Sequence, residues 1–348
     1  MRAAFIKGVQ RFEVRDVILP PPGPEQLLLD VIACGVCGTN LHDWYRGSVA
    51  GLETPGAVGH EILASVVVAG SEVSGFAAGD TVVINPSAIA ACQVCPACRD
   101  GAAWFCSAKN KVASYGFAEQ MLVPASTAYA LPPELDGSVA VLAEPLACGV
   151  HAIRHSWTAR GTGCIDGCDV VVIGAGMLGL AAALASRSLG ASSVTIVARY
   201  QHQATAAEAC GADVVLAADA ADLRQVLRSL RPAIVVEAVG AGRDTIEIAT
   251  ECAAWRSEII VLGVFERPPQ VDLGRLTDRE VRLFMPISYA SRDGVHDFDV
   301  ALDILAKSGP RLVSLVTHRF PLDAIDEAFA TAADKRSGAI RVVVGSGG

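Results

Sequence analysis

The chain has 348 residues, of which 52% are hydrophobic and 19% are charged, and its formal net charge is −9. This length allows two domains with sizeable cores, and an acidic chain without a basic cluster is not expected to bind nucleic acid. No apolar run reaches the roughly eighteen residues of a membrane-spanning helix, so we expect no membrane span.

The eleven cysteines and the polar start of the chain bear on its compartment. Lys7, Arg11 and Glu13 make the first residues too polar for a signal peptide. Cysteines without an export signal suit metal ligands and buried thiols better than disulfides. We therefore expect a cytoplasmic protein.

Residues 1–90 contain short β-rich runs separated by proline and glycine turns. Residues 26–33 follow a proline-rich segment, residues 62–69 end at Gly70, and residues 81–84 follow a Gly-Asp turn. Short apolar runs at this spacing are typical of strands. They predict a barrel-like β body.

Two segments of this body carry residues that bind metals. Cys37 opens the first segment, which also holds Thr39 and His42, and the second segment contains His60 and Glu61. Zn²⁺ accepts sulfur, nitrogen and oxygen donors, and a catalytic zinc keeps three protein ligands and an open position. Cys37 and His60 are candidates for two ligands and Glu61 for a third.

A second group of potential metal ligands follows in residues 90–108. Its four cysteines have the spacing C-x₂-C-x₂-C-x₇-C and are Cys92, Cys95, Cys98 and Cys106. Four thiolates can close a tetrahedral structural zinc site. The first three would also suit an iron–sulfur cluster, but the seven-residue gap and the lack of a second cluster motif favour zinc.

Together these motifs resemble the zinc-dependent medium-chain dehydrogenase/reductase family, and the resemblance runs from Cys34 to Val344. It implies an α/β protein with a β-rich second domain, in which a GroES-like catalytic domain accompanies a Rossmann doubly wound parallel sheet. The catalytic domain would comprise residues 1–152 and 288–348, and the cofactor domain residues 153–287. Two zinc ions per chain are implied, one catalytic and one structural.

Residues 143–151 resemble the polyol (sorbitol-type) branch of this family. Glu144 stands where the alcohol dehydrogenases carry a cysteine ligand, so it would bind the catalytic zinc directly or through a water. Glu61 would be either a direct ligand or a neighbour able to enter the coordination shell. Cys148 is the alternative ligand.

A second glycine-rich motif indicates a dinucleotide site. The apolar run 169–173 leads into G-x-G-x-x-G and then a helical segment, which is the context that a Rossmann fingerprint requires. The glycines permit a tight turn and the approach of a pyrophosphate to the helix start. The motif comprises Gly174, Gly176, Met177, Leu178 and Gly179.

The end of the next strand bears on the choice of nicotinamide cofactor. An NAD enzyme carries an acid there, whereas this chain has Ala198, Arg199 and Tyr200. Because Arg199 can bind a 2′-phosphate, NADP(H) is favoured over NAD(H); the alternative is a solvated Arg199 with NAD bound loosely. The resemblance further implies that Val239 lies near the nicotinamide and Arg341 near the pyrophosphate.

These parts lead us to expect an oxidoreductase that interconverts a secondary alcohol or polyol and its carbonyl compound. Thr39 would link the substrate oxygen to the cofactor ribose, and His42 would pass the proton outward. The alternatives are an amino-alcohol (threonine-type) dehydrogenase and an inactive zinc- and cofactor-binding relative. We expect small-molecule substrates and a homodimer or homotetramer.

Overall fold

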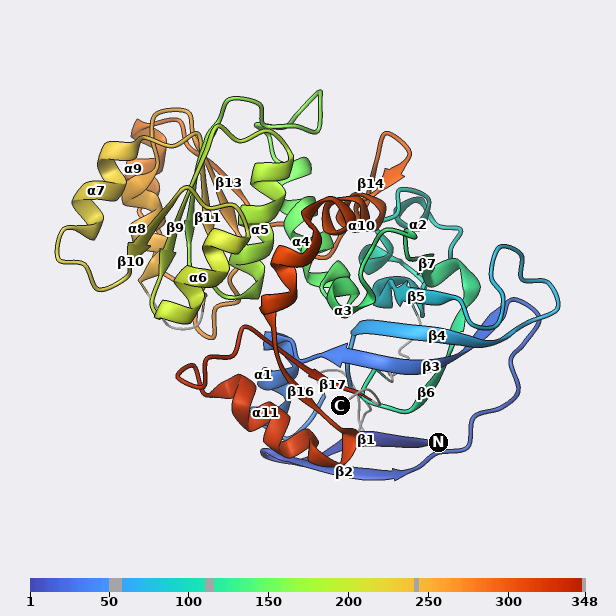
Figure 1. Ribbon diagram of the computed structural model, residues 1–348. Coiled ribbons are helices and arrows are strands. Elements are labelled where there is room, and N and C mark those ends of the chain that lie inside the picture. Colours follow the sequence, from blue (N-terminus) through green and yellow to red (C-terminus); the bar gives the residue numbers. More distant parts are fainter. Residues whose placement is uncertain (50–57, 110–115, 241–243, 346–348) are drawn as a thin grey trace. The chain divides into compact units, whose positions relative to one another are not determined.

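The computed structural model describes residues 1–49, 58–109, 116–240 and 244–345 (Figure 1). The chain forms two compact units, which we call unit 1 (Met1–Glu144 with Leu305–Gly348) and unit 2 (Pro145–Ile304). The divisions fall within two helices, α4 (Ala143–Arg154) and α10 (Asp297–Ser308). Each unit has a hydrophobic core of its own.

Unit 1 is built on a seven-stranded sheet with the order β16-β17-β3-β4-β5-β7, to which β6 adds by pairing with β3. A separate antiparallel pair, β1 and β2, completes its strands. The strands are β1 (Arg2–Gly8), β2 (Arg11–Asp16), β3 (Gln26–Gly35), β4 (Glu61–Ala69), β5 (Thr81–Ile84), β6 (Gln120–Pro124), β7 (Ala128–Ala130), β16 (Val316–Phe320) and β17 (Arg341–Val344). This β body agrees with the sequence prediction.

The pairing of β3 with β4 positions the first candidate metal group. The two strands are antiparallel, and two register shifts along them bring Gly35 opposite Glu61. Cys37 therefore follows the end of one strand where His60 precedes the start of the other. A side chain on Gly35 would not fit, because its Cβ would collide with the Oε2 of Glu61.

Four α-helices belong to unit 1, among the described residues, besides the start of α4 and the end of α10. The first begins directly after Cys37 and ends at Gly47, whose φ of 73° is the left-handed conformation that favours glycine. The Asn40 Oδ1 accepts a 3.1 Å hydrogen bond from the Cys37 amide and so fixes the start of this helix. The helices are α1 (Gly38–Arg46), α2 (Pro96–Arg99), α3 (Gly137–Ala140) and α11 (Ile325–Ala333).

Unit 2 contains a six-stranded sheet in the order β10-β9-β8-β11-β12-β13, in which every pair is parallel. This order confirms the predicted doubly wound sheet. The strands are β8 (Asp169–Ile173), β9 (Ser193–Ala198), β10 (Val214–Ala217), β11 (Ile234–Glu237), β12 (Glu258–Val261) and β13 (Arg282–Phe284), with a small antiparallel pair β14 (Ser291–Arg292) and β15 (Val295–His296).

Helices lie on both sides of this sheet, with α5 and α6 on one side and α7, α8 and α9 on the other (Figure 1). The nearly continuous apolar strands agree with burial of the sheet on both faces. Among the described residues, no helix is both long and apolar enough to cross a membrane. The helices are α5 (Met177–Ser188), α6 (Gln201–Ala209), α7 (Leu223–Leu230), α8 (Thr245–Cys252) and α9 (Leu273–Asp278).

Candidate active site and metal centres

The first candidate metal group lies at the adjoining ends of β3 and β4 in unit 1. One donor atom from each of Cys37, His60 and Glu61 lies within 4.8 Å of the other two. A thiol, an imidazole and a carboxylate at this separation form a donor set that suits Zn²⁺. The structure thus brings together three residues that the sequence placed in two separate segments.

Glu61 is fully buried, and its charge is balanced by a buried arginine. The Glu61 Oε2 lies 2.9 Å from Arg341 Nη1, and the same nitrogen donates a 2.7 Å hydrogen bond to the Val36 carbonyl oxygen. Among the described residues, the Glu61 Oε1 has no hydrogen-bond partner. A buried carboxylate oxygen without a partner is costly, and a cation in the group would satisfy it.

The pKa of Cys37 also fits a metal-binding group. Burial raises the pKa of this thiol, and the nearby charge of Glu61 raises it further. The group as it stands therefore favours the thiol, whereas a divalent cation would stabilise the thiolate. The donors present fit zinc.

Glu144, the second residue of α4, responds to the same surroundings. Burial raises its pKa to about 8; the charges of Glu61 and Cys37 raise it as well, whereas His60 lowers it. Glu144 is not one of the three residues whose donor atoms lie within 4.8 Å of one another. It lies near enough to sense the group electrostatically.

Thr39 and His42 lie on the first turns of α1. Thr39 is exposed and hydrogen-bonds with Cys37, which lowers the pKa of the thiol against the larger effect of burial. His42 is half-buried. Both side chains therefore belong to the helix that begins at the candidate metal ligand.

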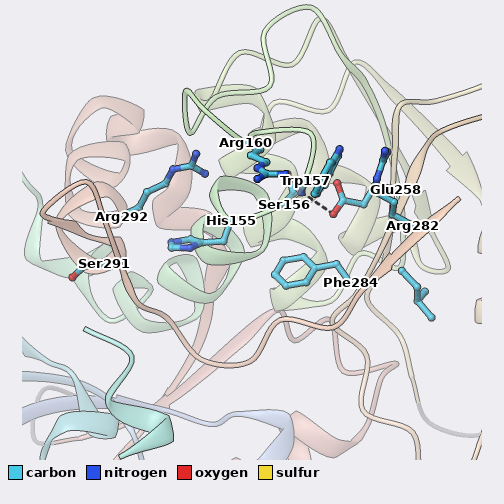
Figure 2. A pocket seen from close by; sticks show the side chains of 10 residues that line it. His155, Ser156, Trp157, Arg160, Glu258, Arg282, Phe284, Ser291 and Arg292 are labelled. Atoms are coloured by element: carbon cyan, nitrogen blue, oxygen red, sulfur yellow. Dashed lines mark hydrogen bonds between the residues drawn. The ribbon is translucent and has the colours of Figure 1, made fainter. Parts of the chain in front are cut away.

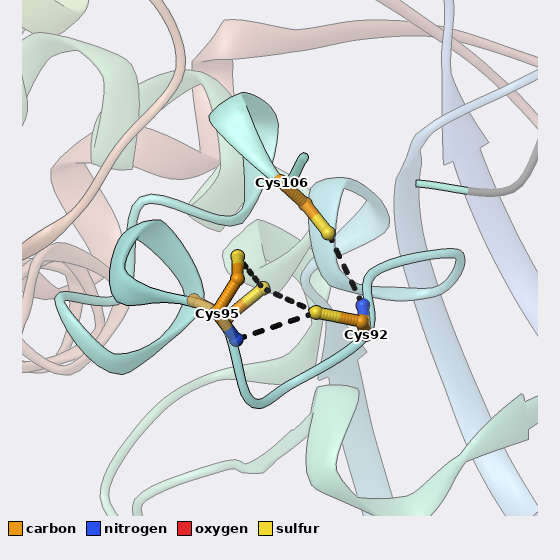
Figure 3. A group of neighbouring side chains, drawn as sticks. Cys92, Cys95 and Cys106 are labelled. Atoms are coloured by element: carbon orange, nitrogen blue, oxygen red, sulfur yellow. Dashed lines mark hydrogen bonds between the residues drawn. The ribbon is translucent and has the colours of Figure 1, made fainter. Parts of the chain in front are cut away.

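The four predicted cysteines of the second group converge (Figure 3). The sulfur of Cys98 lies 3.5 Å from that of Cys95 and 4.0 Å from that of Cys92. Sulfurs bound tetrahedrally to one zinc at about 2.3 Å would be roughly 3.8 Å apart, so these separations fit a single ion. They are too long for a disulfide.

Backbone amides favour the thiolates of Cys95 and Cys106, whereas burial raises the pKa of Cys98 to about 12. The Cys95 amide donates to the Cys92 sulfur at 3.4 Å, and the Cys92 amide donates to the Cys106 sulfur at 3.3 Å (Figure 3). Backbone hydrogen bonds from Cys98 and Ser107 lower the pKa of Cys95 to about 6. Thiolates are the form that binds zinc.

A third group of possible ligands, His151, His155 and Asp297, lies in unit 2. The buried Asp297 carboxylate contacts His151 Nδ1 at 2.8 Å and Arg154 Nη1 at 3.0 Å, and it accepts the Ala290 amide at 2.9 Å. Burial acts to raise the pKa of Asp297, but hydrogen bonds with His151, His155 and the Ala290 amide outweigh it and the pKa is lowered. The carboxylate is satisfied by protein donors and ties α4 to α10.

The glycine motif of unit 2 lies between β8 and α5. Gly174 has a φ of 105°, and a Cβ on it would lie 2.5 Å from the Val239 side chain. A Cβ on Gly176, in contrast, would meet no atom within 4 Å. The space above Gly176, beside the start of α5, fits the approach of a pyrophosphate.

The predicted cofactor residues of unit 2 gather at the carboxyl ends of neighbouring strands. Ala198 ends β9 and is buried, and Arg199 follows on the surface. The Arg199 guanidinium lies 5.6 Å from the centre of the Tyr200 ring, which stacks on His202 at 5.5 Å. Arg341 belongs to unit 1, and its place at the pyrophosphate stays a prediction.

Glu237 is a positioning residue that the sequence analysis did not assign. It is fully buried at the end of β11, and its Oε1 accepts the amides of Val239 and Gly240, both at 2.9 Å. The carboxylate thus fixes the turn that contains Val239. In the sequence, the feature that could have indicated this role is an acidic residue at the end of an otherwise apolar strand.

Comparison with known proteins agrees with this architecture. The model of the alcohol dehydrogenase GroES-like domain matches residues 23–133, and that of the glucose dehydrogenase C-terminus matches residues 137–345. Human sorbitol dehydrogenase is 28% identical over 342 residues, covering 94% of this chain and 91% of its own length. The L-galactonate-5-dehydrogenase of Escherichia coli is 28% identical over 319 residues, covering 89% of each chain.

Solved structures lead to the same class. A protein from Sinorhizobium meliloti described as a zinc-binding dehydrogenase, bound to NADP, has a TM-score of 0.84 and 27% identity, with 99% of both chains covered. The fold and the donor groups therefore define a zinc-dependent alcohol or polyol dehydrogenase, an oxidoreductase that uses a nicotinamide cofactor. The chain belongs to the zinc-dependent medium-chain dehydrogenase/reductase family, in its polyol dehydrogenase-like part.

Proposed function

We propose that this dehydrogenase prefers NADP(H) and acts on a polyol, a sugar acid or a related secondary alcohol. The main support for the cofactor preference comes from the end of β9. Ala198 stands there in place of an acid, and Arg199 follows on the surface. A carboxylate there would bind a ribose hydroxyl and repel a 2′-phosphate, whereas a guanidinium attracts the phosphate. The NADP bound by the Sinorhizobium meliloti relative supports the proposal.

The substrate class rests on relatives and on the carboxylates of unit 1. Sorbitol, L-idonate and L-galactonate dehydrogenases are among the similar proteins. We assign Cys37, His60 and Glu144 as ligands of a catalytic zinc, with Glu61, paired to Arg341, as a neighbour able to enter its coordination shell. When bound, zinc supplies a Lewis acid at the substrate oxygen. A second zinc would be held by the four cysteines.

The remaining chemistry needs a route for the alcohol proton. We assign Thr39 to hold the substrate hydroxyl, since it is exposed two residues after Cys37, and His42 to pass the proton to water. A histidine suits this step because it titrates near neutrality. In unit 2 the glycine loop would bind the pyrophosphate, and the turn fixed by Glu237 would contact the nicotinamide.

The cofactor preference is tested by steady-state kinetics with NADP(H) and NAD(H) on a panel of sorbitol, L-idonate, L-galactonate and threonine. We expect kcat/KM to favour NADP(H) at least about tenfold, equal to roughly 1.4 kcal/mol. The Ala198→Asp/Arg199→Ala variant should reverse the preference, while Arg311→Gln, an exposed arginine of unit 1, should leave it unchanged. Equal kcat/KM values for the two cofactors in the wild type would contradict the proposal, and oxidation of threonine alone would move the substrate to amino alcohols.

The proton route is tested with His42→Gln. We expect turnover to fall about 10- to 100-fold and its dependence on pH to flatten, because the side chain assigned to pass the proton is removed. His318→Gln, which changes a histidine hydrogen-bonded to Thr317, is the matched control. An unchanged pH profile in His42→Gln would show that water alone carries the proton.

A further inference from the structure

A pocket of about 460 Å³ lies in unit 2 (Figure 2). Glu258 and Arg282, which line it, are the first residues of the parallel strands β12 and β13. The glycine loop follows the carboxyl end of β8 in the same parallel sheet. The pocket therefore lies at the opposite edge of the sheet from the dinucleotide motif, and the cofactor does not account for it.

The pocket carries an excess of positive charge. Three arginines line it, and the acid among its lining residues, Glu258, is 2% exposed. Arg292 pairs with Asp293 at 3.5 Å, which leaves the charges of Arg160 and Arg282. The Glu258 carboxylate accepts the amide of Trp157 at 2.9 Å and the amide and hydroxyl of Thr158, both at 3.0 Å. Its oxygens are thus occupied by neutral donors, and no ion pair joins it to an arginine in the described part of the chain. The lining arginines are Arg160, Arg282 and Arg292.

Two of these guanidiniums are held on one indole ring. The Arg160 and Arg282 guanidinium carbons lie 4.4 Å and 4.6 Å from the centre of the Trp157 ring. Figure 2 shows these three side chains grouped on one side of the pocket, with Arg292 on the other. Cation–π contact uses the face of a guanidinium and leaves its N–H donors for other partners; of these, Arg282 Nη1 donates to the Arg256 carbonyl oxygen at 3.5 Å.

Several surface arginines of unit 2 form ion pairs with carboxylates of the same unit. Arg187 pairs with Asp213, Arg228 with Glu251, and Arg256 with Glu280. Within the residues that the structure describes, neither Arg160 nor Arg282 forms such a pair, although the chain has a net charge of −9. Both guanidiniums thus lack a carboxylate partner, and a bound anion would interact favourably with each of them.

We propose that this pocket binds a phosphoryl dianion, as inorganic phosphate or as the phosphate of a small metabolite. Arginine forks match phosphate oxygens with paired, charge-assisted hydrogen bonds, and a dianion neutralises both cations that flank Trp157. The side chain of Ser156 or Ser291 offers a further hydroxyl in the lining. The site is separate from the catalytic group, and the proposal does not depend on the substrate assigned above.

The test uses the full-length zinc-loaded enzyme saturated with NADPH, so that the dinucleotide site is already filled. Inorganic phosphate is titrated at constant ionic strength, with sodium chloride as the replacement salt, and binding is followed by calorimetry and by tryptophan fluorescence. A hexose 6-phosphate is titrated in parallel to separate free phosphate from a phosphorylated metabolite. The variants are Arg160→Gln, Arg282→Gln and their double, with Arg311→Gln as the control outside unit 2.

We expect one phosphate site per chain, with affinity weakened at least about tenfold in each single variant and lost in the double variant. Trp157→Phe should retain binding and abolish the fluorescence change, which places the signal at this ring. Tighter binding of the hexose phosphate would assign the site to a phosphorylated metabolite. Phosphate binding that is absent, or equal in the wild type and the double variant, would overturn the proposal. So would a double variant that changes only the sedimentation coefficient, since the arginines would then pair with a second copy.

Discussion

The two candidate metal groups of unit 1 are held in different ways. The four-cysteine group draws all its donors from the single segment 92–106, and its sulfurs accept backbone amides of that segment. The group of Cys37, His60 and Glu61 instead depends on the register of β3 against β4. One site is thus a local feature of the chain, whereas the other is a product of the folded sheet.

Charge separates the two groups as well. In the four-cysteine group, four thiolates can complete a tetrahedral zinc site with no other side chain as a ligand. The mixed group contains a buried carboxylate, and a buried charge is tolerated only when it is paired. Arg341, on β17, provides that pairing at 2.9 Å from Glu61. The mixed group therefore depends on strand register and on an ion pair with a distant strand, whereas the four-cysteine group depends only on its own segment.

Removal of a ligand from the mixed group should have the largest effect. We expect His60→Ala to lower kcat/KM on the order of 10³-fold, equal to about 4 kcal/mol, because the Lewis acid is lost. The variant should keep one zinc per chain and a wild-type circular dichroism spectrum. His318→Ala serves as the control. A variant that keeps more than about a tenth of the activity would remove His60 from the assigned ligands.

The Arg341→Met variant tests whether the buried charge of Glu61 depends on its ion pair with Arg341. Methionine keeps much of the volume but leaves the Glu61 charge buried and unpaired, which costs about 3–5 kcal/mol of unfolding free energy. The double variant Arg341→Met/Glu61→Gln should recover most of this loss, because the buried charge is also removed. Urea unfolding of the metal-free proteins, in which no bound cation offsets the Glu61 charge, measures both. If the double variant is as unstable as the single one, the ion pair is not the cause.

Cys98→Ser should have the smallest effect on catalysis. We expect loss of one zinc per chain and of about 2–3 kcal/mol, seen as a thermal midpoint lower by roughly 5–10 °C. At low temperature kcat should stay within about twofold of the wild type, because the segment is a local structure. Cys164→Ser, a half-buried cysteine of unit 2, is the control. A large fall in kcat with the fold intact would show that the two groups are coupled.

The features that could be predicted from the sequence are those encoded within a single short segment of the chain. The cysteine spacing, the glycine loop and the apolar strands are each visible within their own segment, and the parallel sheet follows from the alternation of strands with helices. The convergence of Cys37 with His60 came from the resemblance to a family. Its geometric cause, the register of β3 and β4, appears only in the sheet.

Pairings between distant segments were not predictable from the sequence. Arg341 meets Glu61 because β17 lies beside β3, and no local pattern encodes that neighbour. The same holds for Arg160 and Arg282, which reach one indole ring from different segments of unit 2. The sequence shows Glu237 as an acid at the end of a strand, but its hydrogen bonds to the following turn are seen only in the structure.

X-ray absorption at the zinc edge tests the central contrast between the two groups most directly. With two zincs per chain, one bound by four sulfurs and one by a single sulfur with nitrogen and oxygen, the wild type should average about 2.5 sulfur ligands per zinc. The His60→Ala variant, left with the closed site, should show about four. An average near four in the wild type, or an unchanged average in the variant, would contradict the account.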